Sequence, residues 1–312
     1  MLNTPVVFII FNRPQAAESV FKTIAAAKPK KLFIIADGPR QGQLQDAEKC
    51  SASRAIIERA DWDCEIIKNY SEINLGIKKR ISSGLDWVFS QAEEAIILED
   101  DCLPAPSFFG FCENLLQYYR NNDTIMHIGC NNFQCGKRRT KYSYFFSKYT
   151  HVWGWATWRR AWQYNDSGMK TWPQFKEQGQ MEIVCKDYYE RKYWTDIFDK
   201  AFKGQIDVWA CQWMYSCWSR RGLSTYPSVN LISNIGFGPD ATFCKTPNNV
   251  QSDIETNDIW EIKHPKVIAV NKKADAFTFD YVFGGKQIKA AYSLRARIRR
   301  QLKKISEKLL RR

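Results

Sequence analysis

The chain has 312 residues, of which 45% are hydrophobic and 14% aromatic, so it can bury a large core and intrinsic disorder is excluded for most of it. No apolar run approaches the roughly 20 residues that a membrane-spanning helix needs, and the first residues resemble a strand rather than a signal peptide. The formal charge of +13 is concentrated in residues 286–312, which carry eleven Lys or Arg residues and one acid. These features predict a cytoplasmic protein, peripheral at the inner face of the membrane.

Strand-like and helix-like segments alternate through residues 1–130. Short apolar runs predict strands at residues 5–11, 31–36, 64–68, 95–98 and 124–129. Amphipathic patterns predict helices at residues 15–27, 43–59, 77–91 and 106–120. This order predicts βαβ units in an α/β fold with a mostly parallel sheet, in which ligands bind outside the carboxyl ends of the strands.

Polar residues follow three of these predicted strands. Asn12–Arg13 follows the first strand, Asp37–Gly38 the second and Glu99–Asp101 the fourth, so all three clusters are expected at one edge of the sheet. Three consecutive carboxylates repel one another unless a cation lies among them. The acidic triplet therefore predicts a divalent cation, Mn²⁺ or Mg²⁺, that shares its oxygen ligands with a phosphate-bearing substrate.

Glycine-rich phosphate loops are absent from the sequence. Neither G-x-G-x-x-G nor G-x-x-x-x-G-K-[ST] occurs, which argues against a dinucleotide-dependent dehydrogenase and against a P-loop enzyme. The segment Asn74–Arg80 offers a different phosphate site, because a turn leads into a helix start that carries three cations. Exposed cations on a helix are more often simply solvated, which is the alternative interpretation.

Residues 131–285 lose the regular alternation and are rich in tryptophan. Residues 151–158 read HVWGWATW, and a glycine between two tryptophans predicts a sharp turn or a close backbone approach. We expect Trp153, Gly154 and Trp155 to form a loop that closes over a ligand. A further strand with a glycine-bearing exit is predicted at residues 227–238.

Residues 286–312 form a separate basic tail. Ile298, Leu302, Ile305 and Leu309 have helical spacing, so the tail is predicted to be an amphipathic helix. Such a helix can lie on an anionic membrane surface, to which each basic residue contributes about 1 kcal/mol. A solvated or partner-binding helix is the alternative, and nucleic-acid binding is the least favoured interpretation.

Six segments together match a known family. They are VVFIIFNRP, LFIIADGPR, NLGIKKR, IILEDDCLPAPSFF, WGWATWRRAW and NLISNIGFG, all within residues 5–245. The sequence resembles metal-dependent glycosyltransferases of the GT-A fold, most of all bacterial surface-polysaccharide enzymes distantly related to N-acetylglucosaminyltransferase I. The resemblance implies a Rossmann-like GT-A domain, with residues 1–130 as its nucleotide-sugar-binding half and residues 131–285 as its acceptor-binding and catalytic half.

The resemblance also implies roles for residues at the strand ends. Arg13 would lie near the nucleotide phosphates, and Asp37 would hydrogen-bond the uracil. Lys79 or Arg80 would face the diphosphate or the sugar. The full set of implied substrate-binding residues is Asn12, Arg13, Asp37, Gly38, Lys79, Arg80, Glu99, Asp100, Trp153, Gly154 and Trp155.

The acidic triplet corresponds to the DXD motif of that family. Glu99 would reach the donor sugar, Asp100 the ribose or the sugar, and Asp101 the metal. Many GT-A enzymes add a late histidine to the metal, whereas this chain has Phe243–Cys244 in that region. The ion would then be held mainly by Asp101, the diphosphate and water.

The catalytic base is the least defined part of the resemblance. The family places a carboxylate before a tryptophan, where this chain reads DVWACQW over residues 207–213. A direct alignment puts Gln212 or Cys211 at that position, and neither is a good base. Asp207 is the nearest carboxylate, and Asp240 is the other candidate.

These residues imply an inverting glycosyltransferase of surface polysaccharide synthesis. It would move a hexose or N-acetylhexosamine from a UDP-sugar to a glycan or lipid-linked glycan. A nucleotidyltransferase that makes a nucleotide-sugar is the first alternative, although residues 11–14 lack the glycine-rich segment that it normally needs. A non-catalytic glycan-binding protein on the same scaffold is the second.

Overall fold

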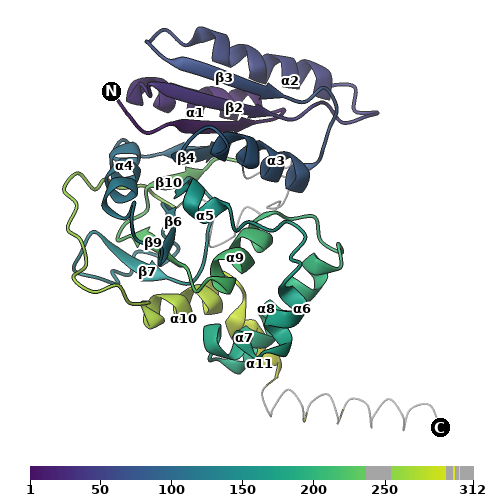
Figure 1. Ribbon diagram of the computed structural model, residues 1–312, viewed down its shortest axis with the longest axis vertical. Coiled ribbons are helices and arrows are strands. Elements are labelled where there is room, and N and C mark those ends of the chain that lie inside the picture. The colour runs from purple at the N-terminus through teal and green to yellow at the C-terminus, as the bar shows by residue number, and fades with distance from the viewer. Residues whose placement is uncertain (237–253, 293–297, 299–301, 303–312) are drawn as a thin grey trace.

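The computed structural model describes residues 1–236, 254–292, 298 and 302 (Figure 1). Its centre is an eight-stranded sheet with strand order β3-β2-β1-β4-β8-β6-β9-β7. Strands β3, β2, β1 and β4 are parallel, and β6 is parallel to β9, whereas β8 and β7 run antiparallel to their neighbours. The predicted α/β class with a mostly parallel sheet flanked by helices is therefore confirmed.

The first half of the chain alternates between strands and helices as predicted. Its elements are β1 (Val6–Ile10), α1 (Pro14–Ala27), β2 (Lys31–Ala36), α2 (Asp46–Ala55), the 3₁₀ helix η1 (Ile56–Arg59), β3 (Glu65–Tyr70), α3 (Ile77–Phe89), β4 (Glu94–Glu99), β5 (Cys102–Pro104), α4 (Phe108–Tyr118) and β6 (Ile125–Gly129). Helix α1 starts at Pro14, whose fixed φ and missing N–H suit the first helical turn. The helix predicted over residues 43–59 is wrong as one piece, because it divides into α2 and η1.

The second half adds strands to the same sheet and a group of helices beside it. Its elements are β7 (Tyr144–Ser147), β8 (Trp155–Trp158), α5 (Arg159–Trp162), α6 (Trp172–Glu177), α7 (Gln180–Val184), α8 (Tyr188–Phe202), α9 (Ala210–Ser219), β9 (Leu223–Pro227), β10 (Ile232–Asn234), α10 (Lys272–Tyr281) and α11 (Gly285–Ala291). In Figure 1 the sheet runs down from β3 at the top, and α6, α7, α8 and α11 gather below it.

The loop predicted around Trp153–Trp155 is only partly present. Strand β8 begins at Trp155 and pairs antiparallel with β4, so that Trp155 lies opposite Ile97. The close approach expected at Gly154 is confirmed, because its φ is 54° and an added Cβ would lie 2.3 Å from Ile232 Cδ1. The strand predicted at residues 227–238 is wrong as one piece, since β9 ends at Pro227 and β10 forms a separate pair with β5.

The inner strands of the sheet are buried on both faces, as their continuous apolar sequences require, whereas the edge strand β3 has no fully buried residue. Along β1, Val6, Phe8 and Ile10 pack with α1 and α4, whereas Val7 and Ile9 pack with α3 and α9. A third, mainly aromatic cluster holds α6–α11 together, with Trp172, Trp194, Phe198, Tyr215, Trp218 and Phe279 among its members. Within the part of the chain that the structure describes, no helix is both long enough and apolar enough to cross a bilayer.

Candidate functional site

The ends of the neighbouring parallel strands β1 and β4 are joined by ion pairs. Arg13, three residues beyond β1, contacts Asp100 with Nη1 and Oδ1 3.3 Å apart, and the same Nη1 donates a hydrogen bond to Asp101 Oδ2. The Phe11 N–H donates to Asp100 Oδ2 at 3.1 Å. Two of the polar clusters expected at one sheet edge therefore lie in direct contact.

Negative charge accumulates in this cluster. Burial, together with Asp101 and Asp100, raises the pKa of Glu99 above its usual range. Burial also raises the pKa of Asp100, helped by Asp101 and opposed by Arg13. The three acids thus retain an unfavourable repulsion beside Arg13, which further positive charge would relieve.

The donor atoms of the triplet suit a hard divalent cation, since Mg²⁺ and Mn²⁺ prefer carboxylate oxygens. Among the described residues, however, no group of three or more acidic, histidine or cysteine side chains is spaced to hold an ion by itself. The described residues could therefore supply only part of a metal site, and the role of Asp101 as a metal ligand stays a prediction.

Strand β10 and the residues directly after it contact the acidic triplet and the strand that follows it. The Ile235 N–H donates to the carbonyl oxygen of Asp101 at 2.8 Å, and β10 pairs with β5 directly after the triplet. An added Cβ at Gly236 would lie 2.3 Å from Asp101 Oδ2, so only glycine fits there without displacing the carboxylate. Ile235 and Gly236 thus fix the position of Asp101.

The side chain of Asp37 links the end of β2 to the start of α3 through hydrogen bonds. This buried carboxylate accepts hydrogen bonds through Oδ1 from the N–H groups of Gly38 at 3.0 Å and Leu75 at 2.9 Å. Its Oδ2 accepts from the Gly76 N–H at 3.2 Å. Gly38 is closely packed, because an added Cβ would lie 2.5 Å from the Ile73 backbone. The contact of Asp37 with uracil stays a prediction.

The cations at the start of α3 separate into two groups. Arg80 is 5% exposed, and its Nη2 donates to Asn69 Oδ1 at 2.8 Å and to the Asn69 carbonyl oxygen. Its guanidinium is therefore committed to β3, which corrects the expectation that it faces a substrate diphosphate. Lys79 is exposed and lines a pocket together with Lys78.

That pocket brings Asp207 to the start of α3. It has a volume of about 270 Å³ and is lined by Leu75, Lys78, Lys79, Ser82, Ser83, Asp86, Ser167 and Asp207. Asp207 precedes α9, yet a methyl group on Gly76 would lie only 3.7 Å from Asp207 Oδ2. The lining residues of α3 recur every three to four positions, a spacing that marks one helix face and could have identified Ser82 and Ser83 from the sequence.

Asn12 belongs to a second polar cluster at the same edge. Its Nδ2 donates to Asp46 Oδ1 at 2.8 Å, and Arg40 Nε donates to Asp46 Oδ2 at 2.6 Å. The hydrogen bond from Arg40 lowers the pKa of Asp46 to about 2, although partial burial opposes the shift. Sequence reasoning missed Arg40 and Asp46, which belong to a loop and a helix start with no periodic signal.

The tryptophan segment divides between surface and core. Trp155 has no exposed surface and stacks on His127 with 5.0 Å between ring centroids, so its expected contact with substrate is corrected to a core role. Trp153 is half-buried and packs edge-on against Phe133 at 5.2 Å. The contact of Trp153 with an acceptor stays a prediction.

Four residues are candidates for the position of the catalytic base. Cys211 is unsuitable, because burial raises the pKa of its thiol to about 12. Gln212 is 1% exposed, and its amide, which cannot act as a base, has no hydrogen-bond partner among the described residues. Asp240 lies outside the described residues. Of the two candidate carboxylates, Asp207 is the one that the structure describes, and it lines a pocket.

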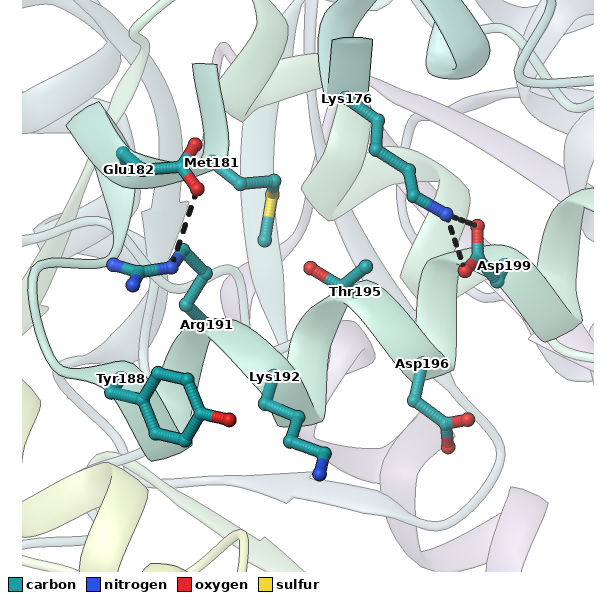
Figure 2. Close-up of a pocket in the computed structure, with 9 residues that line it drawn as sticks. All are labelled: Lys176, Met181, Glu182, Tyr188, Arg191, Lys192, Thr195, Asp196 and Asp199. Atoms are coloured by element: carbon teal, nitrogen blue, oxygen red, sulfur yellow. Dashed lines mark hydrogen bonds and ion pairs between the residues drawn. The ribbon is translucent and has the colours of Figure 1, made fainter. Parts of the chain in front are cut away.

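A larger polar pocket on α6, α7 and α8 has a different character (Figure 2). It measures about 400 Å³, and its charged groups largely pair with one another or with adjacent residues. Lys176 contacts Asp199 at 2.7 Å, Arg191 contacts Glu182 at 3.4 Å, and Asp196 pairs with Lys200. The first two pairs join α6 and α7 to α8, the third lies within α8, and the pocket contains none of the predicted site residues.

No protein-family model matches the chain, and no curated protein matches it in sequence. Among solved structures, the chain is similar to a UDP-glucose pyrophosphorylase complexed with UDP-glucose, with a TM-score of 0.29 and 12% identity over 47% of this chain and 63% of that one, which is less than two thirds of its length. It is also similar to the mannosyltransferase PcManGT from Pyrobaculum calidifontis in complex with GDP-Man and Mn²⁺, with a TM-score of 0.38 and 12% identity over 70% of each chain. The 4-diphosphocytidyl-2C-methyl-D-erythritol synthase of Anaerococcus prevotii gives a TM-score of 0.37 and 10% identity over 72% of this chain and 88% of that one. These similarities are distant and assign no function to this chain.

Proposed function

We propose that the protein is an inverting, metal-dependent glycosyltransferase. It moves a hexose or N-acetylhexosamine from a UDP-sugar to a glycan or lipid-linked glycan acceptor, in the synthesis of a surface polysaccharide. The observation that carries the proposal is the contact of Arg13 with Asp100 and Asp101 at the ends of two neighbouring parallel strands. A diphosphate needs both positive charge and a shared cation, and this edge offers a guanidinium next to carboxylate oxygens.

The donor diphosphate lies against this strand edge in the proposed complex. Arg13 binds its oxygens, and Lys79 faces the diphosphate or the sugar. A Mn²⁺ or Mg²⁺ ion, held by Asp101 together with diphosphate and water oxygens, would supply further positive charge to the departing UDP. Glu99 and Asp100 contact the sugar and ribose hydroxyl groups, and Asp37 contacts the uracil.

Transfer is a single displacement at the anomeric carbon. The acceptor oxygen forms a bond to this carbon, the bond to the phosphate oxygen breaks, and UDP leaves with the electron pair. Asp207 takes the proton of the acceptor hydroxyl, which typically accelerates such a step by 10²–10⁴-fold. The position of Asp207 in a pocket beside Gly76, at the start of the helix that Asp37 holds, supports this role.

The test is the release of UDP from a panel of UDP-hexoses and UDP-N-acetylhexosamines in the presence of Mn²⁺. We expect Asp101→Asn and Asp207→Asn each to lower kcat at least about 100-fold. Asp123→Asn removes an exposed carboxylate that precedes β6, at the opposite edge of the sheet from the strand ends of the site, and should retain full activity. Full turnover in Asp101→Asn would contradict the proposal.

The same protein should be incubated with UTP and a sugar 1-phosphate. A nucleotidyltransferase would release pyrophosphate from this mixture, whereas the proposed glycosyltransferase would not. A glycan-binding protein would bind sugar without UDP and without metal, and would release neither product.

A further inference from the structure

A cavity of about 460 Å³ lies apart from the proposed donor site, between the α7–α8 region, the start of β9 and helices α10 and α11. None of the predicted site residues lines it. Its walls are largely apolar, with Ile183, Val184, Trp218, Leu223, Val270 and Phe279 among the lining side chains. The volume lies within the range of small-molecule sites, which is about 300–1,000 Å³.

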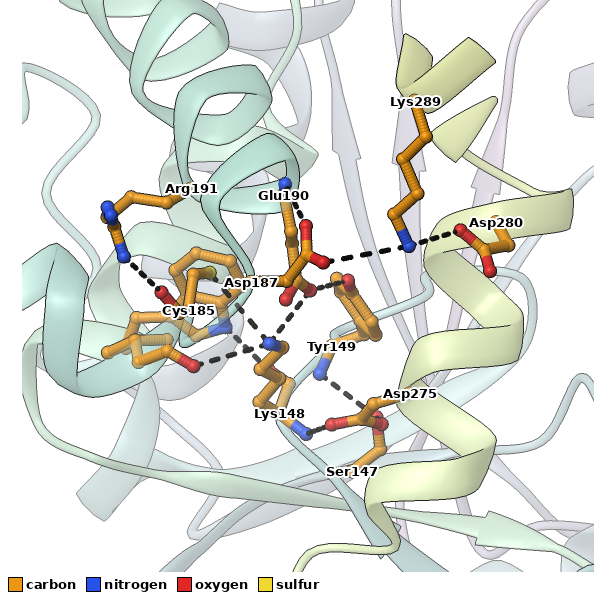
Figure 3. Close-up of polar contacts among 12 residues, drawn as sticks. Ser147, Lys148, Tyr149, Cys185, Asp187, Glu190, Arg191, Asp275, Asp280 and Lys289 are labelled. Atoms are coloured by element: carbon orange, nitrogen blue, oxygen red, sulfur yellow. Dashed lines mark hydrogen bonds and ion pairs between the residues drawn. The ribbon is translucent and has the colours of Figure 1, made fainter. Parts of the chain in front are cut away.

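More cations than acids line this cavity, and some of the cations have no acidic partner among the described residues. Two of its lining acids form ion pairs with lining cations: Glu190 pairs with Lys148 at 2.7 Å, and Asp187 with Lys289 at 3.7 Å (Figure 3). Lys289 also pairs with Asp280, which lies outside the lining. Lys186, Arg221 and Lys272 also line the cavity and make no ion pair with any described residue.

The buried side of the cavity is held in place by a hydrogen-bonded network. Asp275 accepts from Ser147 Oγ at 2.6 Å and from the Lys148 N–H at 3.3 Å, and Lys148 Nζ also donates to the Val184 carbonyl oxygen at 3.2 Å (Figure 3). These groups hydrogen-bond to one another, so they need no ligand as a partner. They also do not neutralise Lys186, Arg221 and Lys272, which form no ion pair with a described residue. The cavity is therefore preformed, apolar inside and positive at its surface.

We propose that this cavity binds a single-chain lipid with a phosphate head group. The hydrocarbon chain fills the apolar interior, and the head group contacts Arg221, Lys186 and Lys272, since guanidinium and ammonium groups bind phosphate oxygens well. Helix α11, which supplies Lys289, leads along the chain into residues 293–312, where nine of twenty residues are Lys or Arg. A membrane surface would supply such a lipid beside this basic segment. The proposal is independent of the glycosyltransferase activity.

Calorimetric titration of the full chain with dodecyl phosphate, below its micelle concentration, tests the proposal. Inorganic phosphate probes the head group alone, and dodecyltrimethylammonium has the same chain with the opposite charge. We expect dodecyl phosphate to bind at least tenfold more tightly than either. Equal binding of inorganic phosphate or of the cationic amphiphile, or no binding of dodecyl phosphate, would overturn the proposal.

Two variants and two matched controls localise the binding. Ala276→Trp fills the cavity from α10, and Lys272→Glu reverses a charge at its surface; each should weaken dodecyl phosphate at least tenfold. Ala290→Trp and Lys273→Glu change exposed residues of α11 and α10 outside the lining and should bind as the native chain does. If Ala276→Trp does not fold, Lys272→Glu decides alone, and undiminished binding in that variant would refute the site.

Discussion

At the scale of single residues, adjacent side chains of the same charge can have different surroundings in the fold. Lys79 and Arg80 are adjacent cations, yet Lys79 lines the Asp207 pocket whereas Arg80 is buried against Asn69. Their different directions follow from the rotation of about 100° between neighbouring helix residues. The helical spacing that groups Lys79 with Ser82 and Ser83 also separates it from Arg80, but the contact of Arg80 with Asn69 depends on the fold.

His127 is a residue whose protonation the fold opposes. It is fully buried on β6, where Nδ1 accepts from Trp213 Nε1 at 3.2 Å and Nε2 lies 2.9 Å from the His151 carbonyl oxygen. These partners suit a neutral ring with its proton on Nε2. Burial lowers the pKa of His127 to about 3, despite the bond to the His151 carbonyl.

This shift predicts a loss of stability in acid. Between pH 6.5 and 3 the unfolded chain binds a proton at His127 that the folded chain does not, so the free energy of unfolding falls as the pH falls through this window. The contribution is about 1.4 kcal/mol per pH unit. Urea unfolding at several pH values should show a correspondingly shallower decline for His127→Gln. An identical pH dependence in the variant would show that His127 is not the group responsible.

At the scale of elements, local sequence patterns predict the bounds of a strand better than they predict which strands pair with one another. The apolar run at residues 31–36 has the bounds of β2, because a buried parallel strand is defined by its own composition. The insertion of β8 between β4 and β6 depends on contacts between segments some 60 residues apart in sequence, which no local pattern encodes. The local sequence therefore predicts a ligand loop at Trp155, whereas pairing with Ile97 places this residue in the core.

The turn that leads into β8 requires glycine at position 154, for its backbone conformation and for its packing. Gly154 and Gly204 both have positive φ, 54° and 68°, so alanine at either position costs about 1–2 kcal/mol of backbone strain. An added Cβ at Gly204 meets no atom within 4 Å, whereas at Gly154 it would overlap the Ile232 side chain. Overpacking of this kind costs about 1–3 kcal/mol more. Urea unfolding should therefore show Gly154→Ala to be less stable than Gly204→Ala by about that amount, and equal stabilities would contradict the packing argument.

At the scale of the whole molecule, basic residues are concentrated in the predicted tail, residues 286–312. Within it, residues 293–312 carry nine basic residues and one acid, and most of this segment lies outside the described residues. Its predicted role at a membrane therefore rests on sequence alone. A chain that ends at Tyr292 keeps α11 and should bind vesicles rich in anionic lipid at least tenfold more weakly in sedimentation assays, because up to about 1 kcal/mol per basic residue is lost.

UDP binding by the same truncated chain provides the control, since the strand-edge residues are retained. Neutral vesicles should bind neither form. Unchanged sedimentation with anionic vesicles after truncation would refute the membrane role of the tail.

The central claim is that the edge formed by Arg13, Asp37 and Asp101 binds a nucleoside diphosphate together with a divalent cation. Calorimetric titration of the full chain with UDP, with and without Mn²⁺, tests it most directly. We predict that Mn²⁺ tightens UDP binding at least tenfold in the native chain and in Asp123→Asn, and that Asp101→Asn loses this dependence on metal. Absence of UDP binding, or the same Mn²⁺ dependence in Asp101→Asn as in the native chain, would contradict the claim.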